Sequence, residues 1–216
     1  AFTCELDESE PREVAEKMCM LLNDKLQMPS PAADIVIHLC SGNYDNPNGI
    51  SALLRAAGVG VLDIDNHAQY GGGESANLLN NGVFNFIWQL VRAHRVIGII
   101  SGQKCATGTV KRLEAGEGMP EKVLSQEHPN GMPGLNAAYQ KEVHDCALLG
   151  YRITELLKLV YTQGGWFLAE CPEVRGDSQR QVSFDPAFKT HSTVMDMDHW
   201  NQLQQQTGAH RVVSAM

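Results

Sequence analysis

Short runs of β-branched and aliphatic residues alternate along this chain with longer segments of helical periodicity. The β-rich runs are residues 35–39, 59–64, 96–100 and 166–169, and helical patterns cover residues 50–57, 76–94 and 136–162. Strands that alternate with helices form βαβ units, in which the strands are parallel and the crossovers are right-handed. The alternation therefore predicts an α/β fold of Rossmann-like type, with a mostly parallel sheet and helices on both faces.

The segment before the first β-rich run predicts a packing helix. Pro11 suits a first helical turn, apolar residues then recur at intervals of three and four, and Pro29 and Pro31 end the pattern. We expect residues 1–31 to form a helical extension and residues 32–216 to form one α/β domain. Within that domain, the Gly- and Pro-containing stretch at 114–135 is too long for an ordinary connection and predicts a functional or covering loop.

Composition narrows the function classes. The chain is 43% hydrophobic and 19% charged, which is typical of globular proteins. No apolar run reaches the roughly 18 residues that a membrane span needs, and acidic residues interrupt the start, so we expect no signal peptide. Because the first residue is Ala1 rather than Met, we expect a processed form or a fragment. A net charge of −8 disfavours binding of nucleic acid through its phosphates.

Cysteine and histidine spacing does not predict a metal site. The six cysteines contain no CxxC pair, and the eight histidines form neither HxH nor HxxxH. An intracellular, reducing compartment is the simpler interpretation.

Ligands of parallel α/β sheets bind beyond the carboxyl ends of the strands, so the residues that follow each run are the candidates for function. Ser41 and Gly42 follow the first run, and a Gly there lets the backbone turn tightly beside a ligand. Asp63 ends the second run, where an acidic residue accepts hydrogen bonds from ribose hydroxyls in nucleotide-binding folds. A plain turn and a solvated strand end are the alternative interpretations.

Cys105 and Glu170 follow the third and fourth runs. A cysteine there is a nucleophile if its thiolate is stabilised, and Lys104 and Lys111 are nearby cations. A partly buried glutamate such as Glu170 can donate a proton to a ring nitrogen. The alternatives are an inert thiol and a simple strand-end acid.

Three cysteines, Cys40, Cys105 and Cys171, each follow a predicted strand. If those strands are neighbours, the sequence allows a disulfide between Cys105 and Cys171, or a metal site that includes His38. Three unrelated thiols are the favoured alternative.

Over residues 34–214, the order of these features resembles the C5-cytosine DNA methyltransferase superfamily, most closely a compact branch found in algal, dinoflagellate and mobile-element-like sequences. Residues 127–135 and 175–177 also resemble that branch, and five stretches match the family's motifs. They are His38–Gly42 (HLCSG) for the D-L-F-S-G motif, Asp63 for the acid after the second strand, Asn77 for the adenine-reading Asp, Cys105 in QKCATGT for the P-C nucleophile, and Glu170 in ECP for the E-N-V motif.

The resemblance implies a mechanism and a cofactor. Cys105 would attack C6 of a flipped cytosine, and Glu170 would hold the base edge and protonate N3. The methyl group would then pass from S-adenosylmethionine to C5. Ser41, Gly42, Asp63 and Asn77 would line the cofactor.

The chain also departs from the family pattern. His38 replaces the motif Asp, Lys104 replaces the Pro before the nucleophile, Gly108-Thr109 replaces Phe-Ser, and Cys171 replaces Asn. The Arg-bearing motif and the target-recognition region that the family carries are not in this sequence.

We therefore expect a degenerate methyltransferase-like domain that acts as a non-catalytic structural or accessory subunit bound to protein partners. Its compartment would be the nucleus if it acts on DNA, or an organelle if it is an accessory subunit. The alternatives are an active cytosine methyltransferase that uses Cys105, and a regulator that binds S-adenosylmethionine without chemistry.

Overall fold

The computed structural model describes residues 35–43, 46–70, 72–103, 106–108, 112, 121–171 and 190–212. The chain divides into two compact units. Unit 1 takes in residues 1–101 and 159–168, and unit 2 takes in residues 102–158 and 169–216. The predicted helical extension and its boundary at residue 31 lie outside the described residues.

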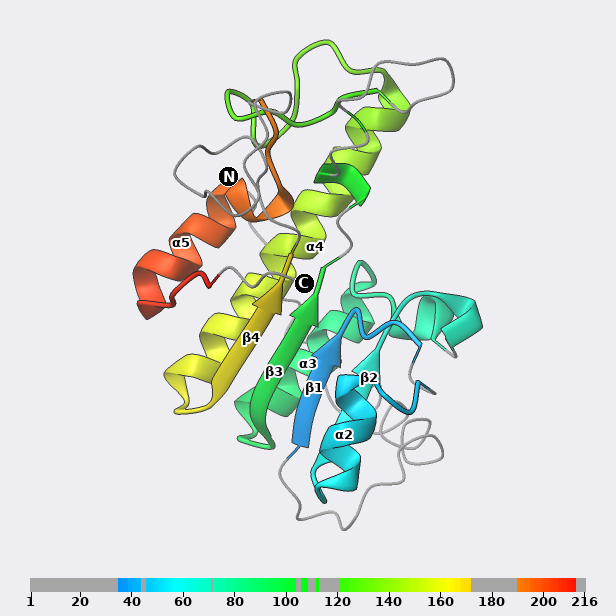
Figure 1. Ribbon diagram of the computed structural model, residues 1–216, viewed down its shortest axis with the longest axis vertical. Coiled ribbons are helices and arrows are strands. Elements are labelled where there is room, and N and C mark those ends of the chain that lie inside the picture. Colours follow the sequence, from blue (N-terminus) through cyan, green and yellow to red (C-terminus); the bar gives the residue numbers. More distant parts are fainter. Residues whose placement is uncertain are drawn as a thin grey trace. The chain divides into compact units, whose positions relative to one another are not determined.

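A four-stranded sheet in the order β2-β1-β3-β4 forms the centre of unit 1 (Figure 1). The strands are β1 (Ile35–Leu39), β2 (Gly60–Ile64), β3 (Val96–Gly102) and β4 (Trp166–Glu170), and only the carboxyl-terminal ends of β3 and β4 belong to unit 2. All four strands are parallel, which confirms the predicted sheet and is consistent with a Rossmann-like fold. Every residue of β1 is buried, as expected for a central strand.

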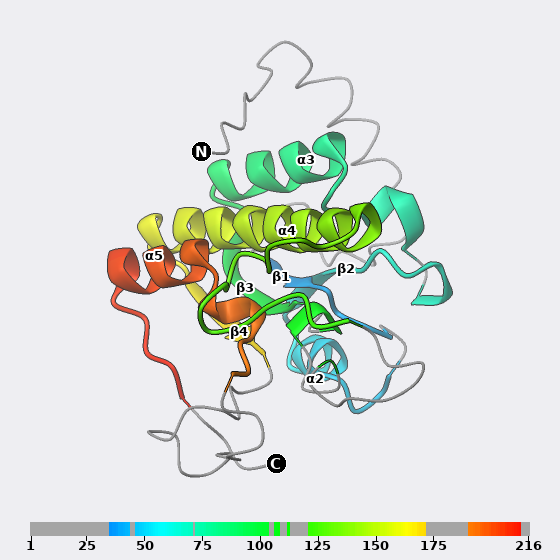
Figure 2. The same ribbon diagram turned by 90° about the horizontal axis from the view of Figure 1, so that it is seen from above.

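Helices cover both faces of this sheet, as the sequence predicted. Helix α2 (Ile50–Ala56) connects β1 to β2, and α3 (Asn81–Arg92) connects β2 to β3 on the opposite face (Figure 2). Helix α3 begins where the Asn80 side chain accepts a hydrogen bond of 2.8 Å from the Gly82 amide. Its start is later than the predicted residue 76 because residues 73–76 form a separate 3₁₀ turn.

Unit 2 contains most of α4 (Ala137–Thr162), which spans residues close to those predicted, and α5 (Asp198–Thr207). Residues 121–136 contain no helix or strand, as expected for the long loop, although Val123 and Leu124 are buried. The sequence analysis did not predict α5. This helix buries Trp200 and Leu203, and it ends at Gly208, whose φ of 69° is left-handed.

Within the described part of the chain, no helix is both long enough and apolar enough to cross a membrane.

Candidate functional site

The rim is the edge of the sheet at which the carboxyl ends of β1 and β2 meet. After β1 the backbone turns through Gly42, whose φ of 68° is in the left-handed region. The Gly42 amide donates a hydrogen bond of 2.9 Å to Oδ2 of Asp65, which directly follows β2. The other oxygen of this carboxylate accepts a 2.8 Å hydrogen bond from the His67 amide. The amide expected to face a ligand therefore binds a side chain of the protein itself.

Asp63 points away from the rim. In the parallel pair of β1 and β2 it is the partner of His38, so both side chains lie on the face that α2 covers. From α2, Ser51 donates a hydrogen bond to Oδ1 and Arg55 forms an ion pair with Oδ2. We call His38, Ser51, Arg55 and Asp63 the Asp63 cluster.

The proton positions in the Asp63 cluster follow from its geometry. Ser51 has one hydroxyl hydrogen, which it donates to Asp63. Nδ1 of His38 lies 2.8 Å from Ser51 Oγ and must therefore donate its own hydrogen to the Ser51 oxygen. A nucleophilic serine needs the reverse arrangement, with a base that accepts its proton. Ser51 is also buried. The cluster therefore joins β1, β2 and α2 rather than presenting a nucleophile.

The cluster sets the charge of Asp63. Burial of this carboxyl, whose side chain is 10% exposed, raises its pKa. Hydrogen bonds from His38, Ser51 and Arg55, together with the charge of Arg55, outweigh that effect and lower the pKa below its ordinary value of 3.8. Asp63 is therefore ionised at neutral pH and balanced by Arg55.

Asn77 and Ser41 bind to their own loops. The Asn77 side chain accepts a hydrogen bond of 3.0 Å from the Leu79 amide and donates one of 3.2 Å to Oε2 of Glu74. Ser41 Oγ makes a long contact of 3.5 Å to the Gly42 carbonyl. Of the four predicted cofactor residues, Ser41 and Gly42 are at the rim. Asp63 is in the Asp63 cluster beneath α2, and Asn77 is in the loop before α3. Their cofactor role stays a prediction.

The described residues do not test the predicted catalytic pair of Cys105 and Glu170. Cys105 lies outside them, as do Lys104 and Lys111. Glu170, which the sequence analysis expected to be partly buried, is instead exposed at the end of β4, and it belongs to unit 2. The predicted disulfide and metal site both involve Cys105, so they too remain predictions. No group of three His, Cys, Asp or Glu among the described residues could hold a metal ion.

Sequence analysis missed a buried polar contact in unit 2 that begins directly after β3. The amide nitrogen of Gln103 donates to the carbonyl of Cys146 at 3.2 Å, and its oxygen accepts a 3.2 Å hydrogen bond from the indole of Trp200. Burial raises the pKa of the Cys146 thiol to about 11. Gln103 thus joins α4 to α5 and leaves Cys146 as a neutral, unreactive thiol.

The described residues of unit 2 also form pockets. Two of them are lined by none of the predicted catalytic or cofactor residues. One has a volume of about 180 Å³, and its lining residues are Thr107, Gly108, Arg112, Lys122, Val123, Leu124, His191 and Ser192. The other, of about 220 Å³, lies between α4 and α5 and includes Lys158 and His199. The predicted functional loop at 114–135, which supplies Lys122, was the only sequence signal for the first pocket.

Comparison with known proteins gives no relative, since no family model, no curated protein and no solved structure matches this chain.

Proposed function

We propose that this chain is a degenerate C5-cytosine methyltransferase-like domain that acts as a non-catalytic accessory subunit. The observation that carries the proposal is the hydrogen bond from the Gly42 amide to Asp65. A backbone amide at this turn is what a ligand oxygen would bind in a nucleotide-binding α/β fold. In this chain a carboxylate of the protein takes that position.

Charge supports the same proposal. S-adenosylmethionine carries a carboxylate in its amino-acid part, and a ligand carboxylate at the Gly42 amide would meet the negative Asp65 side chain. Two like charges at hydrogen-bond distance repel each other. The second acidic residue, Asp63, is already paired with Arg55 and faces α2, so it offers no replacement at the rim.

Exposed apolar side chains in unit 1 support a role in binding another protein. Leu53 on α2 is 62% exposed, and Trp166 and Leu168 on β4 are 44% and 54% exposed. A Cβ added at Gly98 would lie 2.2 Å from Cε2 of Trp166, so the indole packs against the backbone of β3. Trp166 and Leu168 are two residues apart on β4 and therefore share one face of the strand. A partner with an apolar contact surface fits that face.

One observation favours a second candidate, the regulator that binds S-adenosylmethionine without chemistry. Asp65 directly follows β2, and a carboxylate has about four lone-pair sites, of which the Gly42 and His67 amides use two. A ribose hydroxyl could donate to the remaining sites.

Titration calorimetry with S-adenosylmethionine separates these candidates. The accessory-subunit proposal predicts no saturable heat at ligand concentrations up to about 1 mM. A dissociation constant of that size corresponds to a binding free energy of about −4 kcal/mol. Saturable heat that disappears in Asp65→Asn, and persists in the charge-matched control Asp198→Asn, would establish the regulator instead. Methyl transfer to cytosine-containing DNA that is lost in Cys105→Ser would establish the active enzyme.

The accessory role has its own test in the native source. Gel filtration of an extract should show the chain in an assembly larger than its own 23.7 kDa. Leu168→Asp should release it, whereas the control Val212→Asp, an exposed apolar residue of unit 2, should not. A chain that elutes alone in both cases would refute the subunit proposal.

A further inference from the structure

The first pocket of unit 2, which we call the Lys122 pocket, is built from separate segments of the chain. Its lining residues come from the 3₁₀ turn Ala106–Gly108, from Arg112, from residues 122–124 and from residues 191–192. The space of about 180 Å³ at these residues includes open solvent, so the pocket is a small hollow that is partly open to water. A small group that stays partly in water is what it can bind.

Three contacts hold these segments in place. Nε2 of His191 lies 2.8 Å from the carbonyl of Gly108, which has no hydrogen to give, so the ring nitrogen is the donor. Arg112 donates to the carbonyl of Glu121 at 2.9 Å, and Nζ of Lys122 donates to Oγ1 of Thr190 at 3.1 Å. Contacts within the protein thus hold the segments of the pocket together.

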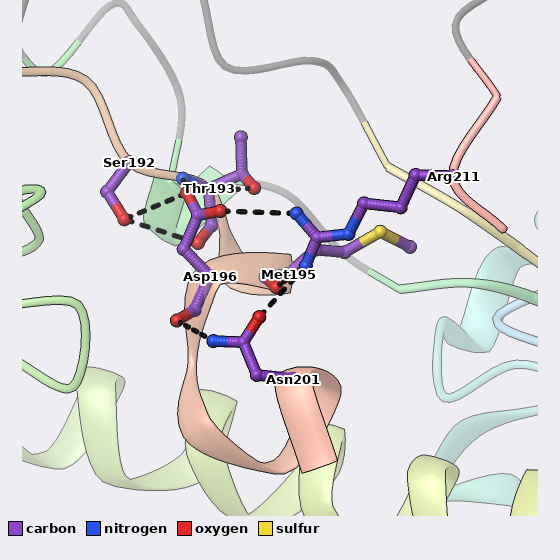
Figure 3. A network of polar contacts seen from close by, with 6 residues as sticks. All are labelled: Ser192, Thr193, Met195, Asp196, Asn201 and Arg211. Atoms are coloured by element: carbon purple, nitrogen blue, oxygen red, sulfur yellow. Dashed lines mark hydrogen bonds and ion pairs between the residues drawn. The ribbon is translucent and has the colours of Figure 1, made fainter. Parts of the chain in front are cut away.

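Asp196 binds the segment that carries the lining residue Ser192 (Figure 3). One carboxylate oxygen of Asp196 accepts hydrogen bonds from the Thr193 amide at 2.8 Å and from the Ser192 hydroxyl at 3.2 Å. Arg211 donates to the carbonyl of Met195 and contacts the other Asp196 oxygen at 3.5 Å. This network sets the position of that segment and balances the charge of Asp196 outside the pocket.

The charge of the lining is positive. Arg112 and Lys122 are its two cations, and none of the eight lining residues is acidic. Arg112 is balanced in part, because it forms an ion pair of 2.5 Å with Glu142. For Lys122, no carboxylate lies within ion-pair distance among the residues that the structure describes, and its bonded partner is the neutral Thr190 hydroxyl. Lys122 is partly buried as a residue and its ammonium is exposed, so among the described residues it carries a positive charge that no ion pair balances.

We infer that the Lys122 pocket binds a phosphate group. An ammonium has three N–H donors, and Lys122 uses one on Thr190, so two can donate to phosphate oxygens. Arg112 also lines the pocket, but its charge is paired with Glu142. The hydroxyl hydrogens of Thr107 and Ser192 go to Glu142 and Asp196, so Lys122 is the residue on which binding depends. The inference does not use the rim and stands apart from the accessory-subunit proposal.

The experiment titrates inorganic phosphate into the full chain at low ionic strength, with chloride of equal ionic strength as the reference, and follows backbone amide resonances by NMR. Saturable shifts at residues 107–108, 122–124 and 191–192 are expected. Lys122→Gln should weaken binding about tenfold, as expected for the loss of one hydrogen bond to a charged group. Lys122→Arg should retain it. Lys141→Gln, which removes an equal charge from the exposed surface of α4, should leave the affinity unchanged.

Each other outcome bears on the inference directly. Equal shifts with phosphate and chloride, or equal weakening by Lys122→Gln and Lys141→Gln, would refute a phosphate site. The amide spectrum of Lys122→Gln without ligand checks that this variant folds. If it unfolds, Lys122→Arg still tests the site, because it keeps the positive charge and should retain phosphate binding. A second arm uses a nucleoside 5′-monophosphate. Tighter binding than phosphate, with shifts at the same residues, would assign a phosphate ester, and equal affinity would assign the free anion.

Discussion

His199 on α5 carries a strong prediction about how stability depends on pH. Burial lowers the pKa of its imidazole from 6.5 to about 4, although the neighbouring Asp198 charge acts in the opposite direction. Its Nε2 atom is buried and has no hydrogen-bond partner in the described part of the chain. That atom faces Gly150 on α4, since a Cβ added there would lie 2.3 Å from it. A proton on Nε2 would therefore be buried without an acceptor.

The sign and size follow from the two pKa values. Because the folded pKa lies below the unfolded value, the unfolded chain takes up the proton more readily. The stabilisation that neutral His199 provides is complete above pH 6.5 and is lost as the pH falls from 6.5 through 4. Each pH unit of separation is worth about 1.4 kcal/mol, so the full loss is about 3 kcal/mol and the loss between pH 7 and pH 5 is about 2 kcal/mol.

Urea unfolding followed by circular dichroism at pH 7 and pH 5 measures this loss. The samples are kept dilute because the isoelectric point is near 5.4. His199→Leu should lose about 2 kcal/mol less than the unsubstituted protein over this interval. His210→Leu, at an exposed position beyond α5, is the matched control. It should lose as much free energy of unfolding between pH 7 and pH 5 as the unsubstituted protein. If His199→Leu and the unsubstituted protein lose the same free energy of unfolding, the neutral buried state of His199 is wrong.

Three further predictions concern other buried groups. Ser51→Ala leaves Asp63 and His38 without their shared partner and should lower the free energy of unfolding by about 1–3 kcal/mol in urea; a change near zero would show that the Asp63 cluster does not hold α2. Cys146 should resist iodoacetamide at pH 8 in the native protein and react after unfolding, as mass spectrometry would report, since its thiol is buried with a pKa of about 11; rapid native alkylation would contradict that burial. Gly98→Ala should shift tryptophan fluorescence to longer wavelength and cost about 1–3 kcal/mol by displacing the indole of Trp166; an unchanged spectrum would mean that the indole does not pack on β3.

Periodicity was sufficient to predict the sheet, because each strand is a short apolar run between turn residues. It failed for α5, in which Trp200 and Leu203 are the only large apolar residues and glutamines fill much of the rest. Two buried apolar residues in ten give too weak a repeat to mark a helix. The left-handed Gly208 after it, and Asp198 in its first turn, were signals that could have found it.

The candidate site shows a different limit of sequence reasoning. That Asp63 ends a strand was clear, but which face it takes depends on its register with β1, and this register pairs it with His38 beneath α2. Asp65, two residues later, lies beyond the strand and reaches the rim. Only the long loop that supplies Lys122 pointed to the Lys122 pocket in the sequence, because the other lining residues come from segments far apart along the chain.

The central claim, that the rim is held by the protein's own side chains, is tested most directly at the Gly42 amide. Its NMR resonance reports on the hydrogen bond to Asp65 and should move when Asp65→Asn removes the charge. On addition of S-adenosylmethionine to about 1 mM, a concentration that would detect even weak binding, we expect the Gly42 resonance of the unsubstituted protein to stay in place. A saturable shift of that resonance would contradict the account, because it would mean that the cofactor reaches the amide that Asp65 occupies.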